Sequence, residues 1–180
     1  MKEIETKVLE VDKKDLQKKL NNLKAKKISD DMLVVDWYGP KGITHNGDDP
    51  YFLRVRSYGN KKIEITCKWN KKISGKTVQC DEVDVLVDDH NKTKVFFEAI
   101  GLENYAHQEK KRTSWKLGSV QFDLDIYPKM PPFLEIEAPS EKEIDEAIKK
   151  LNLQNNETWN DGEKSLIEKK YKLNWRDMRF

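Results

Sequence analysis

The stretch EIETK, residues Glu3 to Lys7, decides the fold. Charged residues at Glu3, Glu5 and Lys7 alternate with Ile4 and Thr6. Alternation with a period of two residues is typical of a β-strand whose two faces differ. One face of this strand is mildly apolar, and the other places two carboxylates beside an ammonium group. Either water covers this charged face or the charges bind something.

The same alternation recurs in most of the strand-like runs downstream. In each run an aliphatic face, such as Val83 and Val85, stands opposite a charged face. The charged positions are Arg54 and Arg56, Glu64 and Lys68, Glu82 and Asp84, Lys110 and Arg112, Asp123 and Asp125, and Glu135 and Glu137. For one strand alone, a solvent-covered face is the simpler interpretation. Recurrence along the whole chain favours one shared charged surface.

The order of predicted elements indicates an α+β fold. Strands are predicted at residues 3–8, 32–39, 51–58, 62–69, 80–87, 110–117, 119–127 and 133–138. Helices are predicted at residues 12–24, 91–102, 140–151 and 163–171, with a loop at 39–50 and a longer connection at 70–77. About eight mainly antiparallel strands can close into a β-barrel. If the helices pack outside on the aliphatic faces, the charged faces line a tunnel.

Composition narrows the class of protein. The chain has 180 residues, of which 37% are charged, and a formal net charge of +2, which gives no reason to expect a nucleic-acid partner. Two cysteines, Cys67 and Cys80, form neither a disulfide framework nor a zinc-ligand set, which indicates a reducing compartment. No apolar run approaches the roughly 20 residues that span a bilayer. We therefore expect a cytoplasmic protein without a membrane partner; a homodimer is compatible with the sequence.

A tunnel lined by both signs of charge predicts an ionic ligand. Burying charge is costly unless the tunnel stays wet or holds a ligand that pairs with it. Arg and Lys would recruit a ligand with many negative charges, and Glu and Asp would recruit divalent cations. Mg²⁺ binds proteins through one or two carboxylates together with phosphate oxygens. A polyphosphate–metal complex would satisfy both halves of such a lining.

These pieces together resemble the CYTH family, the triphosphate tunnel metalloenzymes. The family's N-terminal ExExK motif is present as Glu3-Ile4-Glu5-Thr6-Lys7. The remaining pieces follow in the family's order: Arg54 and Arg56, Lys68, Glu82 and Asp84, Lys110 and Arg112 as a KxR pair, Asp125, and Glu135-Ile136-Glu137 as an ExE motif. The resemblance runs from residue 3 to about residue 137. It implies an eight-stranded antiparallel barrel that forms a tunnel, as a single domain over residues 1–180 with a C-terminal helical segment at about 140–180.

The resemblance also implies roles for the charged residues. Lys7, Arg54, Arg56, Lys68, Lys110 and Arg112 would bind the triphosphate. One or two Mg²⁺ or Mn²⁺ ions would be held by Glu3, Glu5, Glu82, Asp125, Glu135 and Glu137. Glu82 would either ligate metal or orient a basic neighbour. Lys7, Glu5 and Glu137 are the expected catalytic residues, with Lys7 contacting phosphate or positioning the attacking water.

The sequence leaves several alternatives open. The favoured function is a metal-dependent phosphohydrolase acting on inorganic tripolyphosphate, thiamine triphosphate or a nucleoside triphosphate. A class IV adenylyl cyclase making cyclic AMP and pyrophosphate from ATP would use the same lining, and a non-catalytic binding module for polyphosphate or nucleotide is a third reading. Alternation favours Lys110 over Lys111 as the inward residue, and Asp125 is favoured over Asp123. The C-terminal aromatic residues either anchor their segment against the barrel or cover one tunnel mouth.

Overall fold

The computed structural model describes residues 2–43, 45 and 49–180, except for the side chains of Lys2 and Glu3. Its strands are β1 (Lys2–Val8), β2 (Lys26–Pro40), β3 (Tyr51–Tyr58), β4 (Lys62–Ser74), β5 (Thr77–Val87), β6 (Leu102–Leu117), β7 (Val120–Ile126), β8 (Phe133–Ala138), β9 (Thr158–Trp159) and β10 (Asp177–Met178). Its helices are α1 (Lys13–Asn22), α2 (His90–Ala99), α3 (Glu141–Lys150) and α4 (Gly162–Ser165), which continues as a π-helix at Leu166–Lys170.

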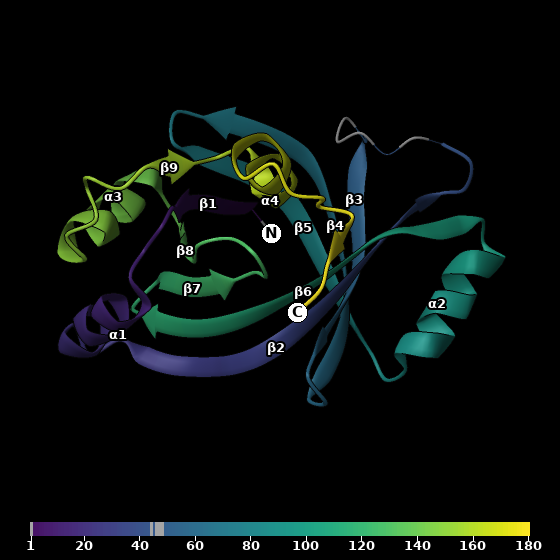
Figure 1. Cartoon of the computed structure of the whole chain (residues 1–180), viewed down its shortest axis with the longest axis horizontal. Helices are drawn as coiled ribbons and strands as arrows, with labels where there is room; N and C mark the ends of the chain where they lie inside the picture. Colours follow the sequence, from purple (N-terminus) through teal and green to yellow (C-terminus); the bar gives the residue numbers. More distant parts are fainter. Residues whose placement is uncertain (1, 44, 46–48) are drawn as a thin grey trace.

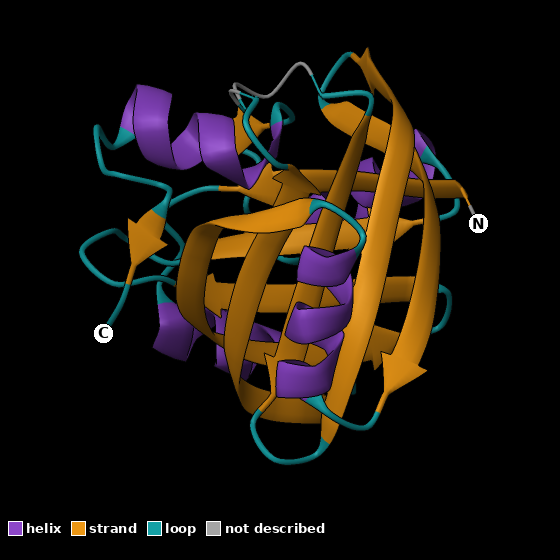
Figure 2. Ribbon diagram, turned by 90° about the vertical axis from the view of Figure 1, so that its right-hand side faces the viewer, coloured by secondary structure: helices purple, strands orange, loops and turns teal. Residues whose placement is uncertain are grey.

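Within the described residues, eight strands close into an antiparallel barrel, as predicted. Their order around the wall is β6-β2-β3-β4-β5-β1-β8-β7, and β7 pairs with β6 again to close the circle. Figures 1 and 2 show the strands curving around a common interior, with the helices outside. None of the described helices has the length and apolar character that crossing a membrane requires.

Strand pairing decides which residues share the interior. Residues directly opposite each other on paired strands point to the same face of a sheet. On β2 and β3, Arg56 lies opposite Val35 and Arg54 lies opposite Trp37. On β6 and β7, Arg112 lies opposite Asp125. The charged faces therefore meet inside the barrel, and a one-residue slip of any pair would turn them outward.

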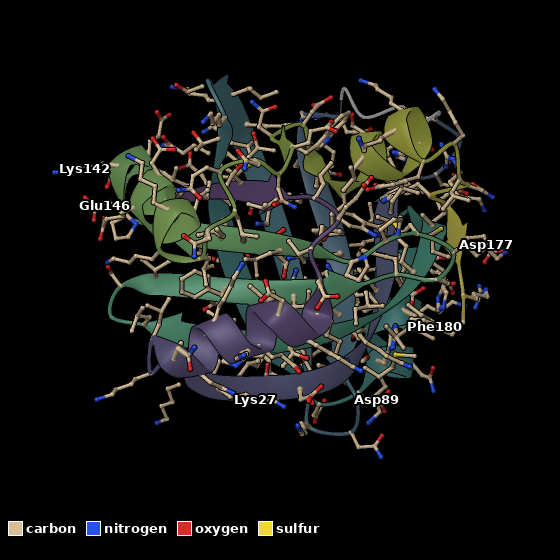
Figure 3. The ribbon with its side chains drawn as sticks, turned by 60° about the vertical axis from the view of Figure 1, so that its left-hand side comes forward. Lys27, Asp89, Lys142, Glu146, Asp177 and Phe180 are labelled. Atoms are coloured by element: carbon tan, nitrogen blue, oxygen red, sulfur yellow. The ribbon has the colours of Figure 1, made fainter. Side chains whose placement is uncertain are left out.

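The helices cover aliphatic outer faces of the barrel, as the alternation predicted. Helices α1 and α3 pack on a cluster that includes Leu124 and Ile136, both fully buried. The carboxylate of Asp12 caps α1, and the hydroxyl of Ser140 caps α3. On another side of the barrel, α2 buries Phe97 against Tyr38. Figure 3 shows the charged side chains of Lys142 and Glu146 projecting from the opposite side of α3.

The predicted bounds of four strands, β2, β4, β5 and β6, were wrong. The connection expected at residues 70–77 is instead a hairpin tip, since β4 continues to Ser74 and β5 starts at Thr77. Gly75, at φ +50°, supplies the left-handed backbone that this two-residue turn needs. Strand β6 starts at Leu102 and β2 at Lys26, both well before the predicted starts. The predicted loop at 39–50 includes residues 44 and 46–48, which lie outside the described residues.

The C-terminal segment lies across the front of the barrel in Figure 1, where it is drawn in yellow. Its apolar side chains Leu166, Ile167 and Trp175 are buried in a cluster with residues of the wall such as Ala106 and Phe133. Strand β10 adds to β6 in parallel at His107 and Gln108. The segment is therefore anchored to the barrel and also covers part of the interior.

Candidate active site

The barrel encloses a cavity of about 720 Å³. The predicted site residues that line it are Glu5, Lys7, Arg54, Arg56, Lys68, Glu82, Arg112, Glu135 and Glu137. Lys110 and Asp125 are fully buried and do not line it. Lys110 is buried while Lys111 is exposed, so Lys110 is the inward residue of this pair. The side chain of Glu3 lies outside the described residues.

The ExExK and ExE motifs lie side by side on β1 and β8. The pairing places Glu5 opposite Glu137 and Lys7 opposite Glu135. Lys7 Nζ is 2.8 Å from Glu5 Oε1 and 3.1 Å from Glu135 Oε2. Burial alone would lower the pKa of Lys7, but the carboxylates of Glu5 and Glu135 outweigh it and raise that pKa above its ordinary value. Lys7 is therefore a buried ammonium fixed between two carboxylates.

Arg112 is the centre of a second buried network. Its Nε donates to Asp125 Oδ1 at 2.6 Å and its Nη2 to Asp125 Oδ2 at 2.5 Å, the two-pronged geometry that a guanidinium forms with a carboxylate. Its Nη1 donates to Asp123 at 2.8 Å, and its Nη2 also reaches Glu135 at 3.2 Å. Asp123 and Asp125 thus both accept hydrogen bonds from the Arg112 guanidinium.

The buried carboxylates of this network carry opposite pKa shifts. Burial raises the pKa of Asp125 above its ordinary value, against the opposing effects of Arg112 and Lys110. Burial also acts to raise the pKa of Glu135, but the charges of Lys7 and Arg112 outweigh it and hold that pKa well below its usual range. The cations around Glu135 therefore stabilise its charged form.

The opposite wall, β3 to β5, carries basic residues paired with acids. Arg56 Nη2 lies 2.6 Å from Glu64 Oε1, and Lys62 Nζ lies 2.8 Å from Glu64 Oε2. Lys68 forms a close ion pair with Glu82 and lies 4.0 Å from Glu5. Glu82 therefore lies directly beside a basic residue of the same wall. An incoming anion would compete with these carboxylates for the cations.

Sequence reasoning missed one residue that the C-terminal segment brings to the site. Glu163, at the start of α4, lines the cavity and accepts hydrogen bonds from Lys110 Nζ and Tyr127 Oη, each at 2.6 Å. Burial alone would raise the pKa of Glu163, but the charge of Lys110 outweighs it, and the pKa falls to about 2. No motif marks Glu163, because its approach depends on the path of a segment about fifty residues beyond its partner in β6.

Three carboxylates could together hold a metal ion. One oxygen each from Asp125, Glu135 and Glu163 lie within 4.8 Å of one another. Carboxylate oxygens are the ligands that Mg²⁺ and Mn²⁺ prefer. Both oxygens of Asp125 are already engaged with Arg112, however. Glu5 and Glu137 line the cavity on adjacent strands, whereas Asp125 does not line it.

A closed antiparallel barrel with paired acidic and basic rows inside defines a class of tunnel proteins. The CYTH domain family matches residues 1–171, and the chain belongs to that family. Among solved structures, the PH1012 protein of Pyrococcus horikoshii is similar, with 26% identity over 86% of this chain and 94% of its own, and a TM-score of 0.71.

Two more distant structures share the fold. A candidate adenylyl cyclase from Hippeastrum, described as having a dominant triphosphatase activity, is 14% identical over 96% of this chain and 97% of its own, with a TM-score of 0.67. A candidate adenylate cyclase from Vibrio parahaemolyticus is 15% identical over 84% of this chain and 83% of its own, with a TM-score of 0.66. A search of curated proteins found no match to this chain.

Proposed function

We propose that this chain is a divalent-metal-dependent phosphohydrolase acting on a triphosphate held in the barrel tunnel, with residues 1–180 as one domain. The observation that carries the proposal is the meeting of Glu5 and Lys7 with Glu137 and Glu135 inside the cavity. It supports a site for both metal and phosphate, because carboxylates and a fixed ammonium lie together there. Membership of the CYTH family supports an enzyme of the triphosphatase and cyclase kind.

The basic residues would bind the phosphate groups. In this proposal Arg54, Arg56 and Lys68 meet the triphosphate from the β3–β4 wall, and Lys7 and Arg112 meet it from the facing strands. Lys110, which is fully buried and does not line the cavity, is included because the resemblance implies it. Arg can contact phosphate oxygens through two N–H groups at once, whereas Lys offers a point charge. Because Arg56 and Lys68 are paired with Glu64 and Glu82, phosphate binding would release those carboxylates or turn them aside.

The acidic residues would hold Mg²⁺ or Mn²⁺. Glu5, Glu135 and Glu137 are the proposed principal ligands, joined by Glu3, Asp125 and Glu82 as the resemblance implies. Their hard oxygen atoms fit either ion. When bound, the ion would neutralise phosphate charge and favour ionisation of the attacking water.

The chain's own residues would then align the reaction. Water would attack the terminal phosphorus and lose a proton to the surrounding solvent, and the bridging oxygen of the leaving diphosphate would take the electron pair of the broken bond. Lys7, fixed by Glu5 and Glu135, would hold a terminal phosphate oxygen or the attacking water at one position. Arg112, fixed by Asp125, would present its charge without reorganising, which is the more effective form of electrostatic stabilisation.

A class IV adenylyl cyclase is the second candidate. It is supported by the shared fold with structures named as candidate cyclases from Vibrio parahaemolyticus and Hippeastrum. In that reaction the ribose 3′-hydroxyl attacks the α-phosphorus and pyrophosphate leaves. We favour hydrolysis because it needs only the phosphate-binding residues, metal and water.

Product identification distinguishes these functions. The purified chain is incubated with tripolyphosphate, ATP and thiamine triphosphate, with Mg²⁺ or Mn²⁺, and products are separated by chromatography. Phosphate release supports the hydrolase, and cyclic AMP from ATP would replace it with the cyclase. Tight binding without any product would make the chain a binding module instead.

Variants test the proposed ligands. Glu5→Gln and Glu137→Gln should lower kcat by about 100-fold or more and weaken Mn²⁺ binding measured by calorimetry. Glu146→Gln, at an exposed position of α3, is the matched control and should change neither quantity. Near-normal turnover and Mn²⁺ binding in the folded Glu5→Gln and Glu137→Gln proteins would remove these residues from the site.

A further inference from the structure

One part of the cavity is lined by aromatic rings. These are Trp37, Phe52, Tyr105 and Trp175, which we call the aromatic end. The ring centroids of Trp37 and Trp175 are 5.3 Å apart, and those of Tyr105 and Trp175 are 6.2 Å apart. Phosphate groups gain nothing from such a surface. Rings of this kind bind planar organic groups by stacking.

The ring of Trp37 is held in place by a buried amide. Trp37 Nε1 donates to Gln108 Oε1 at 2.6 Å, and Gln108 Nε2 donates to the backbone carbonyl of Trp175 at 2.7 Å. Gln108 is fully buried, so these hydrogen bonds face no competition from water. Trp37 itself is only partly buried and lines the cavity. A ring fixed before the ligand arrives loses little entropy on binding it.

The aromatic end adjoins the row of residues that would hold phosphate. Arg54 lies opposite Trp37 in the strand pairing, and its guanidinium carbon is 5.6 Å from the Trp37 ring centre. Arg56 is the next inward residue of the same strand. A ligand with its phosphates at Arg56 and Arg54 would therefore extend any attached organic group toward Trp37 and Phe52.

Charge at this end disfavours a cationic organic group. Besides Arg54 over Trp37, Lys164 Nζ lies 5.4 Å from the Trp175 ring and the Arg176 guanidinium 5.7 Å from the Tyr105 ring. A positively charged ring would meet like charges at each of these faces. The carboxylate of Asp49 also lines the cavity, but it lies 3.1 Å from His45 Nδ1 and is engaged there. An uncharged planar ring can stack on both the indole and the guanidinium.

We propose that the aromatic end binds the uncharged base of a nucleoside triphosphate, in preference to inorganic tripolyphosphate or the cationic thiamine triphosphate. The inference rests on the proposed function for the placement of the triphosphate along Arg54 and Arg56. It adds a substrate class and two specificity-determining residues, Trp37 and Phe52. It does not depend on whether the bound nucleotide is hydrolysed.

Equilibrium binding tests the inference apart from turnover. The full chain is titrated by calorimetry, with Ca²⁺ in place of Mg²⁺, against tripolyphosphate, thiamine triphosphate and the β,γ-imido analogues of ATP and GTP. Phosphate release is measured in the same samples to verify that ligands stay intact. At least one imido nucleotide should bind about ten-fold more tightly than the other two ligands, as expected for one stacked base. Equal or tighter binding of tripolyphosphate or thiamine triphosphate would overturn the inference.

Matched variants locate the binding to the aromatic end. Phe52→Leu and Trp37→Leu should each weaken imido-nucleotide binding about ten-fold relative to tripolyphosphate binding. Phe96→Leu, at a ring 60% exposed on α2, should leave the ratio unchanged. Loss of Trp37 leaves Gln108 Oε1 without its donor and could impair folding. In that case the Phe52→Leu variant alone decides the test. An unchanged ratio in folded Phe52→Leu protein would overturn the assignment.

The two proposals fail separately. Nucleotide binding that depends on Phe52, without release of phosphate or cyclic AMP in Mg²⁺ or Mn²⁺, would sustain the aromatic end and contradict the proposed phosphohydrolase. Hydrolysis of tripolyphosphate alone, with no tighter binding of either nucleotide, would sustain the phosphohydrolase and overturn the aromatic end.

Discussion

The ammonium group of Lys110 lies 2.6 Å from the carboxylate of Glu163, and this contact joins the wall of the barrel to the C-terminal segment. Lys110 is also 2.8 Å from Asp125. A buried cation in β6 is thus shared between its neighbour in β7 and a residue delivered from α4. The C-terminal segment is therefore part of the site's electrostatics as well as part of its cover.

Glu163→Gln should weaken both the ion pair with Lys110 and the attachment of the C-terminal segment to the barrel. The amide keeps the size of the side chain but loses the charge that pairs with Lys110, which still has Asp125 as a partner. We expect the free energy of unfolding to fall by about 1–3 kcal/mol, measured by urea denaturation. Amide hydrogen exchange should also rise in residues 162–170. Glu146→Gln is the control, and equal exchange in both variants would contradict the anchoring role.

Arg112→Lys should destabilise the barrel although the charge is conserved. Lysine cannot reproduce the two-pronged contact with Asp125 while also reaching Asp123, so buried carboxylate oxygens lose their donors. We expect a loss of about 3 kcal/mol in unfolding free energy, since breaking buried ion pairs typically costs about 3–5 kcal/mol. Arg179→Lys, at an exposed position, should cost almost nothing. Similar unfolding curves for the two variants would show that the two-pronged contact between Arg112 and Asp125 adds little stability.

Glu64 should contribute stability that depends on pH. Burial alone would raise its pKa, but hydrogen bonds from Arg56 and Lys62 lower the pKa from 4.5 to about 2. A folded-state pKa below the unfolded value stabilises the protein above pH 4.5, and this contribution is lost as the pH falls toward 2. The difference in unfolding free energy between the wild type and Glu64→Gln should therefore shrink over that window. A difference that stays constant from pH 6 to pH 3 would contradict the shift.

Gly39→Ala should be costly because His45 lies directly against this glycine. An added Cβ would stand 2.1 Å from His45 Cε1, and the ring is also stacked on Tyr105 at 4.1 Å. We expect a loss of about 1–3 kcal/mol, typical of overpacking. In a His45→Ala background the same change should cost much less, which a double-mutant cycle of thermal unfolding would measure. If the two substitutions change the stability of the protein additively, the clash between residue 39 and His45 is excluded.

The alternation of charged and aliphatic residues predicted antiparallel strands that could close into a barrel, and the resemblance to the CYTH family implied that they do. Strands β7 and β8 turn aliphatic side chains such as Leu124 and Ile136 toward α1 and α3, whereas Val83 and Val85 of β5 stay 49% and 52% exposed. Charged residues such as Arg56 and Glu137 point into the interior. The partners of the inward charges were not predictable in the same way. Whether Arg112 contacts Asp123, Asp125 or a ligand depends on cross-strand register, which the alternation alone does not specify.

The errors in strand boundaries have a common cause. The end of β4, from Asn70 to Ser74, is exposed on both faces and so lacks the periodic apolar residues that signal a strand. Its strand conformation comes from pairing with β5, where Lys72 lies opposite Gln79. The first half of β6 is partly buried, and it too is stabilised by long-range pairing with β2. A local sequence pattern does not reveal pairing between distant segments of the chain.

Strand β6 is longer than β7, and their pairing starts only at Lys111. The exposed backbone that would remain beyond this point is partly occupied by β10 at His107 and Gln108. Unpaired strand edges recruit strands from other molecules. Loss of β10 would therefore leave this stretch of β6 with an unpaired edge, and a chain without β10 is expected to self-associate more readily.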